Sequence, residues 1–198
     1  MCYVGADGYC ITNTWKQDDI GWVWLDSSGS MVKNKWVGQY YVDETGHRAI
    51  NTWITQNGKT YYVDAKGIKA VSKWVLYEEK WYYLEADGSK VCNAWRKDSK
   101  GWCWLGADGA MATNEWVPDS KGMCYVGADG YCETNCWKEY LEGWVWLDSE
   151  GSMAKSKWVT YEDAKYYVDA SGYRVEDTAL TIGGKTYVFD ANGVCTNY

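Results

Sequence analysis

Hydrophobic and polar residues alternate along the chain in short runs, and an acidic or glycine-containing turn follows each run. In residues 80–95, KWYYLEADGSKVCNAW, an aromatic run precedes an Asp-Gly turn, and a second run ends at a tryptophan. Alternation on both sides of a glycine turn is typical of a β-hairpin. The turn variants DSSG, DETG, DAKG, GADG and DANG recur along the sequence. The pattern therefore predicts a series of β-hairpins.

The hairpin signal has a period of 21 residues, broken once by a step of 17. A tryptophan closes each period at position 21 of the repeat, and a glycine occupies position 14. We expect residues 1–198 to hold about ten hairpin repeats, the first of them truncated, in a chain that is a fragment of a longer one. The closing tryptophans are Trp15, Trp36, Trp53, Trp74, Trp95, Trp116, Trp137 and Trp158.

The sequence also contains a duplication that is longer than the 21-residue period. Residues 1–36 and 123–158 are identical at 27 of 36 positions. Duplication of a block of repeats explains this identity, whereas a boundary between two unlike domains does not. The sequence therefore predicts a single repeat array over residues 1–198.

Position 10 of the repeat is always apolar, which places one face of the predicted strand inward. Position 8 lies on the same face, so positions 8 and 10 are expected to point into the core and positions 7 and 9 away from it. A two-stranded hairpin is not stable alone, and neighbouring hairpins must stack. The predicted fold is all-β, an elongated β-solenoid of tandem hairpins. Position 10 holds Val4, Leu25, Val42, Val63, Leu84, Leu105, Val126, Leu147, Val168 and Phe189.

Aromatic residues are concentrated in few columns of the repeat. The chain has 15 Trp and 18 Tyr but one Phe and one Pro, and every Trp occupies position 7, 9 or 21. Rings with a polar group suit surfaces that are both apolar and hydrated. The net charge of −7 argues against nucleic acid as a partner. The sequence has neither an apolar run long enough for membrane insertion nor a signal peptide in residues 1–15.

Two repeats, GWVWLDSSGSMVKNKW and KWYYLEADGSKVCNAW, resemble the choline-binding or cell-wall-binding repeats of Gram-positive surface proteins and phage endolysins. Related repeats occur in glucan-binding and clostridial toxin proteins. The last residues, IGGKTYVFDANGVCTNY, resemble the terminal repeat of such arrays. The resemblance implies a secreted, extracellular module at the cell surface. In this family, aromatic cages between hairpins hold choline on teichoic acid or hold glycans, and a separate catalytic domain is often attached.

The resemblance also implies which residues form cages. Each cage would use a closing Trp and the Trp seven residues later, at position 7 of the next repeat. These pairs are Trp15/Trp22, Trp74/Trp81, Trp95/Trp102 and Trp137/Trp144. The expected third walls, in the same order, are Tyr41, Trp104, Tyr125 and Tyr167, and the expected apolar floors are Met31, Met111 and Met153. Ring faces around a quaternary ammonium group attract it by cation–π interaction.

Two departures limit the number of cages. The common family ending TGW is replaced here by endings such as TNTW, KNKW and TNEW, and position 7 lacks Trp in the other complete repeats. At most four cages are therefore expected. The alternatives are that closing Trp residues only wedge between hairpins, or that exposed rings stack on sugars.

The sequence thus predicts a non-catalytic module without a cofactor, whose partner is a cell-wall polymer carrying choline or glycan. The alternative is a structural spacer or receptor-binding region of a larger toxin or adhesin. The sequence makes no prediction about oligomeric state.

The remaining polar and thiol groups give no metal site or catalytic centre. The acidic turns lack the spaced ligand set of a calcium loop, and the single His47 is expected to be a solvated turn residue. The eight Cys lack a zinc spacing. They are expected either as small buried thiols or with a cross-strand Cys2–Cys10 or Cys124–Cys132 disulfide.

Overall fold

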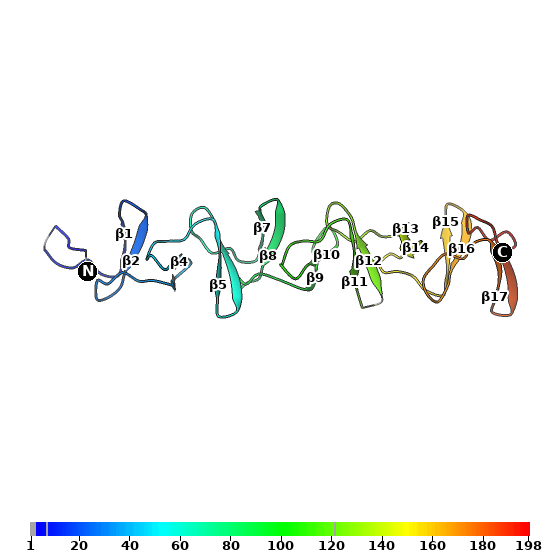
Figure 1. Ribbon diagram of the computed structural model, residues 1–198, viewed down its shortest axis with the longest axis horizontal. Helices are drawn as coiled ribbons and strands as arrows, with labels where there is room; N and C mark the ends of the chain where they lie inside the picture. Colours follow the sequence, from blue (N-terminus) through cyan, green and yellow to red (C-terminus); the bar gives the residue numbers. More distant parts are fainter. Residues whose placement is uncertain (1–2, 7, 121) are drawn as a thin grey trace. The chain divides into compact units, whose positions relative to one another are not determined.

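The computed structural model describes residues 3–6, 8–120 and 122–198. These residues form nine two-stranded antiparallel sheets, and each sheet pairs two consecutive strands (Figure 1). The prediction of an all-β chain of tandem hairpins is confirmed. Across these ranges, no helix is long and apolar enough to cross a membrane.

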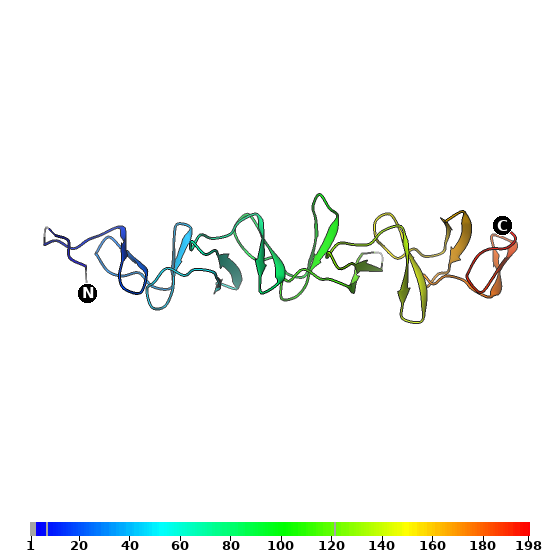
Figure 2. The ribbon, with the colours of Figure 1, turned by 90° about the horizontal axis from the view of Figure 1, so that it is seen from above.

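The chain divides into two compact units, which are described separately. The first comprises Met1–Asn93 with Ala107–Ala110, and the second Ala94–Gly106 with Met111–Tyr198. The strands of the first unit are β1 (Thr14–Gln17), β2 (Trp22–Leu25), β3 (Lys35–Val37), β4 (Tyr40–Val42), β5 (Thr52–Gln56), β6 (Lys59–Val63), β7 (Lys73–Tyr77) and β8 (Lys80–Leu84). The strands of the second are β9 (Ala94–Lys97), β10 (Trp102–Leu105), β11 (Glu115–Pro118), β12 (Met123–Val126), β13 (Cys136–Tyr140), β14 (Gly143–Leu147), β15 (Lys157–Tyr161), β16 (Ala164–Val168), β17 (Thr178–Ile182) and β18 (Lys185–Phe189). Figure 2 shows the same strands from above.

Each ladder joins a strand to a different partner from the one that the sequence pattern indicated. The pattern joined residues 80–84 to the run that ends at Trp95, but β8 instead forms its ladder with the preceding strand β7. Across the Asp-Gly turn the pairing is limited to an isolated bridge between Leu84 and Lys90 and to two backbone hydrogen bonds, from Glu85 to Ser89 and from Val91 to Tyr83. The amide of Lys90 donates to the carbonyl of Thr60 at 2.7 Å, so this segment hydrogen-bonds to the preceding hairpin. The prediction of the pairing partner was therefore wrong, although the hairpins themselves are present.

Acidic residues stabilise the Asp-Gly turns from within. The carboxylate of Asp26 accepts hydrogen bonds from the amides of Ser28 and Ser30 and from the Ser28 hydroxyl, at 2.7–3.0 Å. The hydroxyl of Ser28 is the main cause that lowers the pKa of Asp26, and the two amides add to it. The carboxylate of this aspartate therefore takes the place of a backbone acceptor for the two turn amides.

Within each unit, a recurring backbone hydrogen bond links neighbouring hairpins. The amide at position 16 of one repeat donates to the carbonyl at position 7 of the preceding repeat, and this fixes the two side chains beside each other. In the first unit these bonds run from Arg48 to Trp22, from Lys69 to Gln39 and from Lys90 to Thr60, at 2.7–2.9 Å. In the second they run from Cys132 to Trp102, Met153 to Met123, Arg174 to Trp144 and Cys195 to Lys165, at 2.7–3.0 Å.

The core consists mainly of the position-10 column, as the sequence predicted. These side chains are fully or almost fully buried from Leu25 to Phe189, and only Val4 is exposed. One cluster joins Tyr62 to Val75 and Leu84, which lie on neighbouring hairpins, with Trp53 packed against it. Burial of these apolar side chains stabilises the stacking of one hairpin on the next.

Position 9 differs from the prediction of an outward face. Tyr41, Tyr62, Tyr83 and Trp146 are buried. The reason is the register, because position 9 stands directly opposite the closing Trp of the same hairpin. The two rings pack across the strands, as at Trp36, 5.1 Å from Tyr41. Cross-strand aromatic pairs of this kind stabilise a two-stranded sheet.

His47 is not the solvated turn residue that the sequence predicted. Its ring is half-buried, with Nε2 3.2 Å from both carboxylate oxygens of Asp18 and Nδ1 2.8 Å from the Thr45 hydroxyl. The backbone amide of Gly21 is the main cause that lowers the pKa of Asp18 to about 2, and His47 contributes to the same shift. His47 therefore has a structural role between neighbouring repeats.

One of the two predicted disulfides is present among the described residues. Cys124 and Cys132 are joined, within the second unit. Cys10 is also disulfide-bonded, and its expected partner Cys2 lies outside the described residues. Cys92, Cys103, Cys136 and Cys195 are free thiols.

Candidate aromatic cages between hairpins

Three rings in the first unit surround one cation of the chain itself. Trp15 on β1, Trp22 on β2 and Tyr40 on β4 have their ring centroids 5.9, 5.7 and 5.3 Å from the guanidinium carbon of Arg48. Trp15 and Tyr40 also contact each other edge to face at 5.4 Å. We call this group the Trp15 cage. The structure brings together the predicted pair Trp15 and Trp22, with a side chain of the same protein between them.

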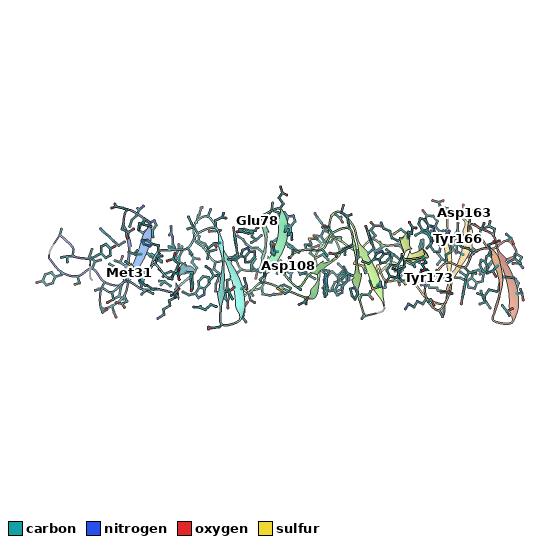
Figure 3. The ribbon with its side chains drawn as sticks, in the orientation of Figure 1. Met31, Glu78, Asp108, Asp163, Tyr166 and Tyr173 are labelled. Atoms are coloured by element: carbon teal, nitrogen blue, oxygen red, sulfur yellow. A yellow bond between two sulfur atoms is a disulfide. The ribbon has the colours of Figure 1, made fainter. Side chains whose placement is uncertain are left out.

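The second unit repeats this arrangement. Trp137 on β13, Trp144 on β14 and Tyr166 on β16 lie 5.3, 5.6 and 6.0 Å from the guanidinium carbon of Arg174. Glu176 accepts hydrogen bonds from this guanidinium at 2.7 Å. Figure 3 labels Tyr166 in this group, which we call the Trp137 cage.

The third wall of these two cages is one residue earlier than predicted. Tyr40 and Tyr166 reach the closing Trp of the preceding hairpin. Their neighbours Tyr41 and Tyr167 point to the other face of the strand, because successive side chains alternate. All four predicted third walls pack on the closing Trp of their own hairpin: Tyr41 on Trp36, Trp104 on Trp95, Tyr125 on Trp116 and Tyr167 on Trp158.

The predicted methionine floors are also displaced. The position-16 residue beside Trp22 is Arg48, and the one beside Trp144 is Arg174, because the backbone hydrogen bond described above comes from the following repeat. Each methionine instead lies over the glycine of the next turn. A Cβ built on that glycine would stand within 3.0 Å of the methionine side chain, for Met31 at Gly46, Met111 at Gly130 and Met153 at Gly172.

The pair Trp95 and Trp102 has no basic residue at position 16. Both rings line a cavity of about 440 Å³ in the second unit. The Cys124–Cys132 disulfide lines the same cavity, where the other cages carry a tyrosine and a cation. Asp119 and Glu150 also line it. Lys97, which stands opposite Trp102 on the paired strand, is exposed, with Nζ 5.6 Å from the Trp102 ring.

Two smaller groups were missed by the sequence reasoning. Lys69 Nζ lies 5.0 Å from the Trp36 ring and 5.5 Å from Tyr61, and Lys90 Nζ lies at the same distances from Trp53 and Tyr82. Position 7 of these groups is Gln39 or Thr60, so each has two rings instead of three. The basic residues in the position-16 column were the signal that could have revealed them.

In each of the four predicted pairs, the exposed ring is the tryptophan at position 7. Trp22, Trp81, Trp102 and Trp144 expose 37, 46, 41 and 40% of their surface. Trp74 lies in the first unit with Trp81, and its ring packs 5.3 Å from Tyr83. A partly exposed indole beside a half-buried one provides both a ligand surface and a fixed support.

Comparison with protein families identifies repeats over more than half of the chain. The family described as choline-binding repeat matches residues 9–48, 30–69 and 89–132. The family described as putative cell wall binding repeat matches residues 72–90 and 156–174. No curated protein sequence gives a significant match.

Solved structures from Streptococcus pneumoniae share the fold. The choline-binding domain of CbpL is 29% identical, with a TM-score of 0.73 over 93% of this chain and 97% of that one. CbpJ from strain TIGR4 is 25% identical, with a TM-score of 0.58 over 98% of this chain and 61% of that one. Choline binding protein F, crystallised with a tetrasaccharide-pentapeptide analogue of peptidoglycan, is 25% identical, with a TM-score of 0.58 over 96% and 60%.

These matches agree with the hairpins and aromatic groups described above. The chain belongs to the choline-binding repeat family and is a cell-wall-binding repeat module with aromatic clusters between its hairpins.

Proposed function

We propose that this module attaches to a choline-bearing cell-wall polymer and that the Trp95 and Trp102 cavity binds the quaternary ammonium group. One observation carries the proposal. Trp95 and Trp102 line a cavity of about 440 Å³ beside a disulfide, and Lys97 on its lining is exposed and contacts the Trp102 ring from the paired strand, whereas a half-buried arginine lies among three rings in the Trp15 and Trp137 cages. Pockets for small ligands have volumes of about 300–1,000 Å³.

The chemistry of the cavity suits a trimethylammonium group. Such a group has no N–H donor, so it gains little from hydrogen-bond acceptors and much from ring faces. Trp95 and Trp102 supply these faces, and the sulfur atoms of Cys124 and Cys132 add a polarisable apolar wall. The carboxylates of Asp119 and Glu150 supply negative charge at the same cavity.

Binding to a polymer would depend on several weak sites. A repeat array that engages a repetitive polymer at two or more places gains avidity without high affinity at any one site. Trp74 and Trp81 remain a predicted second cage, carried by the repeat pattern alone. We further propose that the module acts outside the cell and anchors a catalytic domain located elsewhere in the full-length protein.

Sugar stacking is the competing function, and the exposed indoles at position 7 favour it. Trp81 and Trp102 each expose more than two-fifths of their surface, enough for a sugar ring to stack on the indole. A glycan stacks on an open ring face, whereas a quaternary ammonium group is held more strongly where rings enclose and desolvate it. The two ligands can therefore be separated by competition.

Trp102→Ala should weaken choline binding at this cavity about two- to thirtyfold, because the change removes one of its two indole faces. A cation–π contact contributes about 0.5–1 kcal/mol at an exposed ring and about 2 kcal/mol at a desolvated one, and Trp102, which is 41% exposed, lies between these limits. Titration of the full chain with choline, followed by tryptophan fluorescence and calorimetry, measures the loss.

Thr60→Ala is the control, because position 7 of that repeat has no ring, and its binding should equal that of the unchanged protein. Equal losses in both variants would indicate general unfolding. Binding to purified cell walls should be competed by millimolar choline. Competition by a soluble oligosaccharide but not by choline would assign the cavity to glycan instead.

A further inference from the structure

Basic residues at position 16 lie among the rings of the Trp15 and Trp137 cages. In the Trp15 cage the Nε atom of Arg48 is buried and has no hydrogen-bond partner. Three rings surround the guanidinium carbon at 5.3–5.9 Å. A desolvated cation with few hydrogen bonds is costly unless ring faces compensate. Arg48 thus interacts with its cage as a ligand does.

The type of cation follows the number of rings. Arginine occurs in the two cages with three rings, at Arg48 and Arg174. Lysine occurs in the two groups with two rings, and there a backbone carbonyl accepts a hydrogen bond from the ammonium group. Lys69 Nζ donates to the carbonyl of Asp87 at 3.3 Å, and Lys90 Nζ to that of Asp108 at 2.6 Å. Arg174 likewise has an acceptor, Glu176, at 2.7 Å, so what distinguishes the arginine cages is that the planar guanidinium contacts three rings.

The backbone holds these cations in place before any ligand arrives. The amide of Arg174 donates to the Trp144 carbonyl at 2.8 Å, so its side chain starts beside the cage. The stem then crosses the next turn, where a Cβ on Gly193 would come within 2.8 Å of three Arg174 side-chain atoms. A group tethered this closely has an effective concentration on the order of millimolar or more, which an external ligand must overcome.

We propose that Arg48 and Arg174 are internal ligands that close two complete aromatic cages, and that Lys69 and Lys90 do the same in the two-ring groups. The residue at position 16 then decides which cages of the array accept an external quaternary ammonium group. This inference rests on the proposed function, since it assumes that an open cage binds such a group.

The Trp137 cage is the better place to test the proposal. Arg174 and Trp144 line a cavity of about 740 Å³ together with Tyr173 and Glu176, so the cage has an approach from solvent. Tyr166 of the cage and Tyr173 of the cavity are both labelled in Figure 3. Methionine occupies position 16 at Met31, Met111 and Met153, so the fold accommodates this side chain.

Arg174→Met in the full chain should add one choline site per chain, measured as stoichiometry by isothermal titration calorimetry. Arg48→Met should add one at the Trp15 cage, and the double variant should add two. Lys73→Met is the control, because it removes one positive charge from an exposed strand position outside the cages. Its stoichiometry should equal that of the unchanged protein.

The outcomes separate this inference from the proposed function. If choline binds the unchanged protein and Trp102→Ala weakens it, but neither folded arginine variant gains a site, the internal-ligand proposal is overturned. If Arg174→Met binds choline and the unchanged protein does not, the internal ligand is supported and the proposed function fails. Absence of binding by every protein, with circular dichroism showing folded chains, contradicts both.

Discussion

Gly67→Ala should destabilise the array by about 3 kcal/mol. The backbone of Gly67 has a φ of +73°, where a side chain costs about 1–2 kcal/mol. A Cβ there would also stand 2.9 Å from the carbonyl oxygen of Ala49 and 3.0 Å from Cδ of Arg48. The carbonyl belongs to the backbone of the preceding repeat and cannot move freely, so the clash adds to the cost. Urea unfolding followed by tryptophan fluorescence measures the change.

Gly58→Ala separates the two causes. Gly58 has nearly the same φ, +74°, but a Cβ there would meet no atom within 4 Å. Its replacement should therefore cost only the backbone strain of about 1–2 kcal/mol. If both variants lose the same stability, the close approach between repeats contributes nothing, and the explanation of the position-14 glycine is wrong.

Leu84→Ala should cost about 2–5 kcal/mol, the range for a buried leucine that leaves a cavity. Leu84 is fully buried and packs in one cluster with Tyr62 and Val75 of two neighbouring hairpins. The loss should therefore weaken the contact between the β5–β6 and β7–β8 hairpins. Urea unfolding gives the total loss, and hydrogen exchange should show faster exchange of amides in both hairpins.

Leu76→Ala is the matched control on strand β7. Leu76 is exposed, and substitutions at such sites change stability by about 0.5 kcal/mol or less. A large loss in this variant, or no loss in Leu84→Ala, would contradict the assignment of position 10 as the core column.

The sequence was sufficient for the repeat, the core column and the closeness of Trp15 to Trp22 and of Trp137 to Trp144. Position 10 must be apolar in every repeat because it is enclosed in every hairpin, so its periodicity is visible in one chain. The pairing of Trp15 with Trp22 and of Trp137 with Trp144 around one cation follows from a fixed spacing on consecutive strands.

The contacts between repeats were less predictable. Alternation along one strand does not show which of two adjacent rings reaches the previous hairpin. The sequence therefore predicted Tyr41 as the third wall, whereas the structure has Tyr40 there. The hydrogen bond from Arg48 to the Trp22 carbonyl depends on how hairpins stack, and no residue type marks it. The same reason applies to the strand pairing, since the Asp-Gly turn and the other turns of the repeat both resemble hairpin turns.

The local pairing of the strands has a consequence for how the chain folds. Each described ladder joins consecutive strands, and the position-16 hydrogen bonds join residues only 26 to 30 positions apart. Short sequence separations favour rapid folding, because little loop entropy is lost before contacts form. A finished hairpin can then serve as the template for the next one during synthesis. A duplicated block, such as that shared by residues 1–36 and 123–158, enters such a chain without breaking any distant pairing.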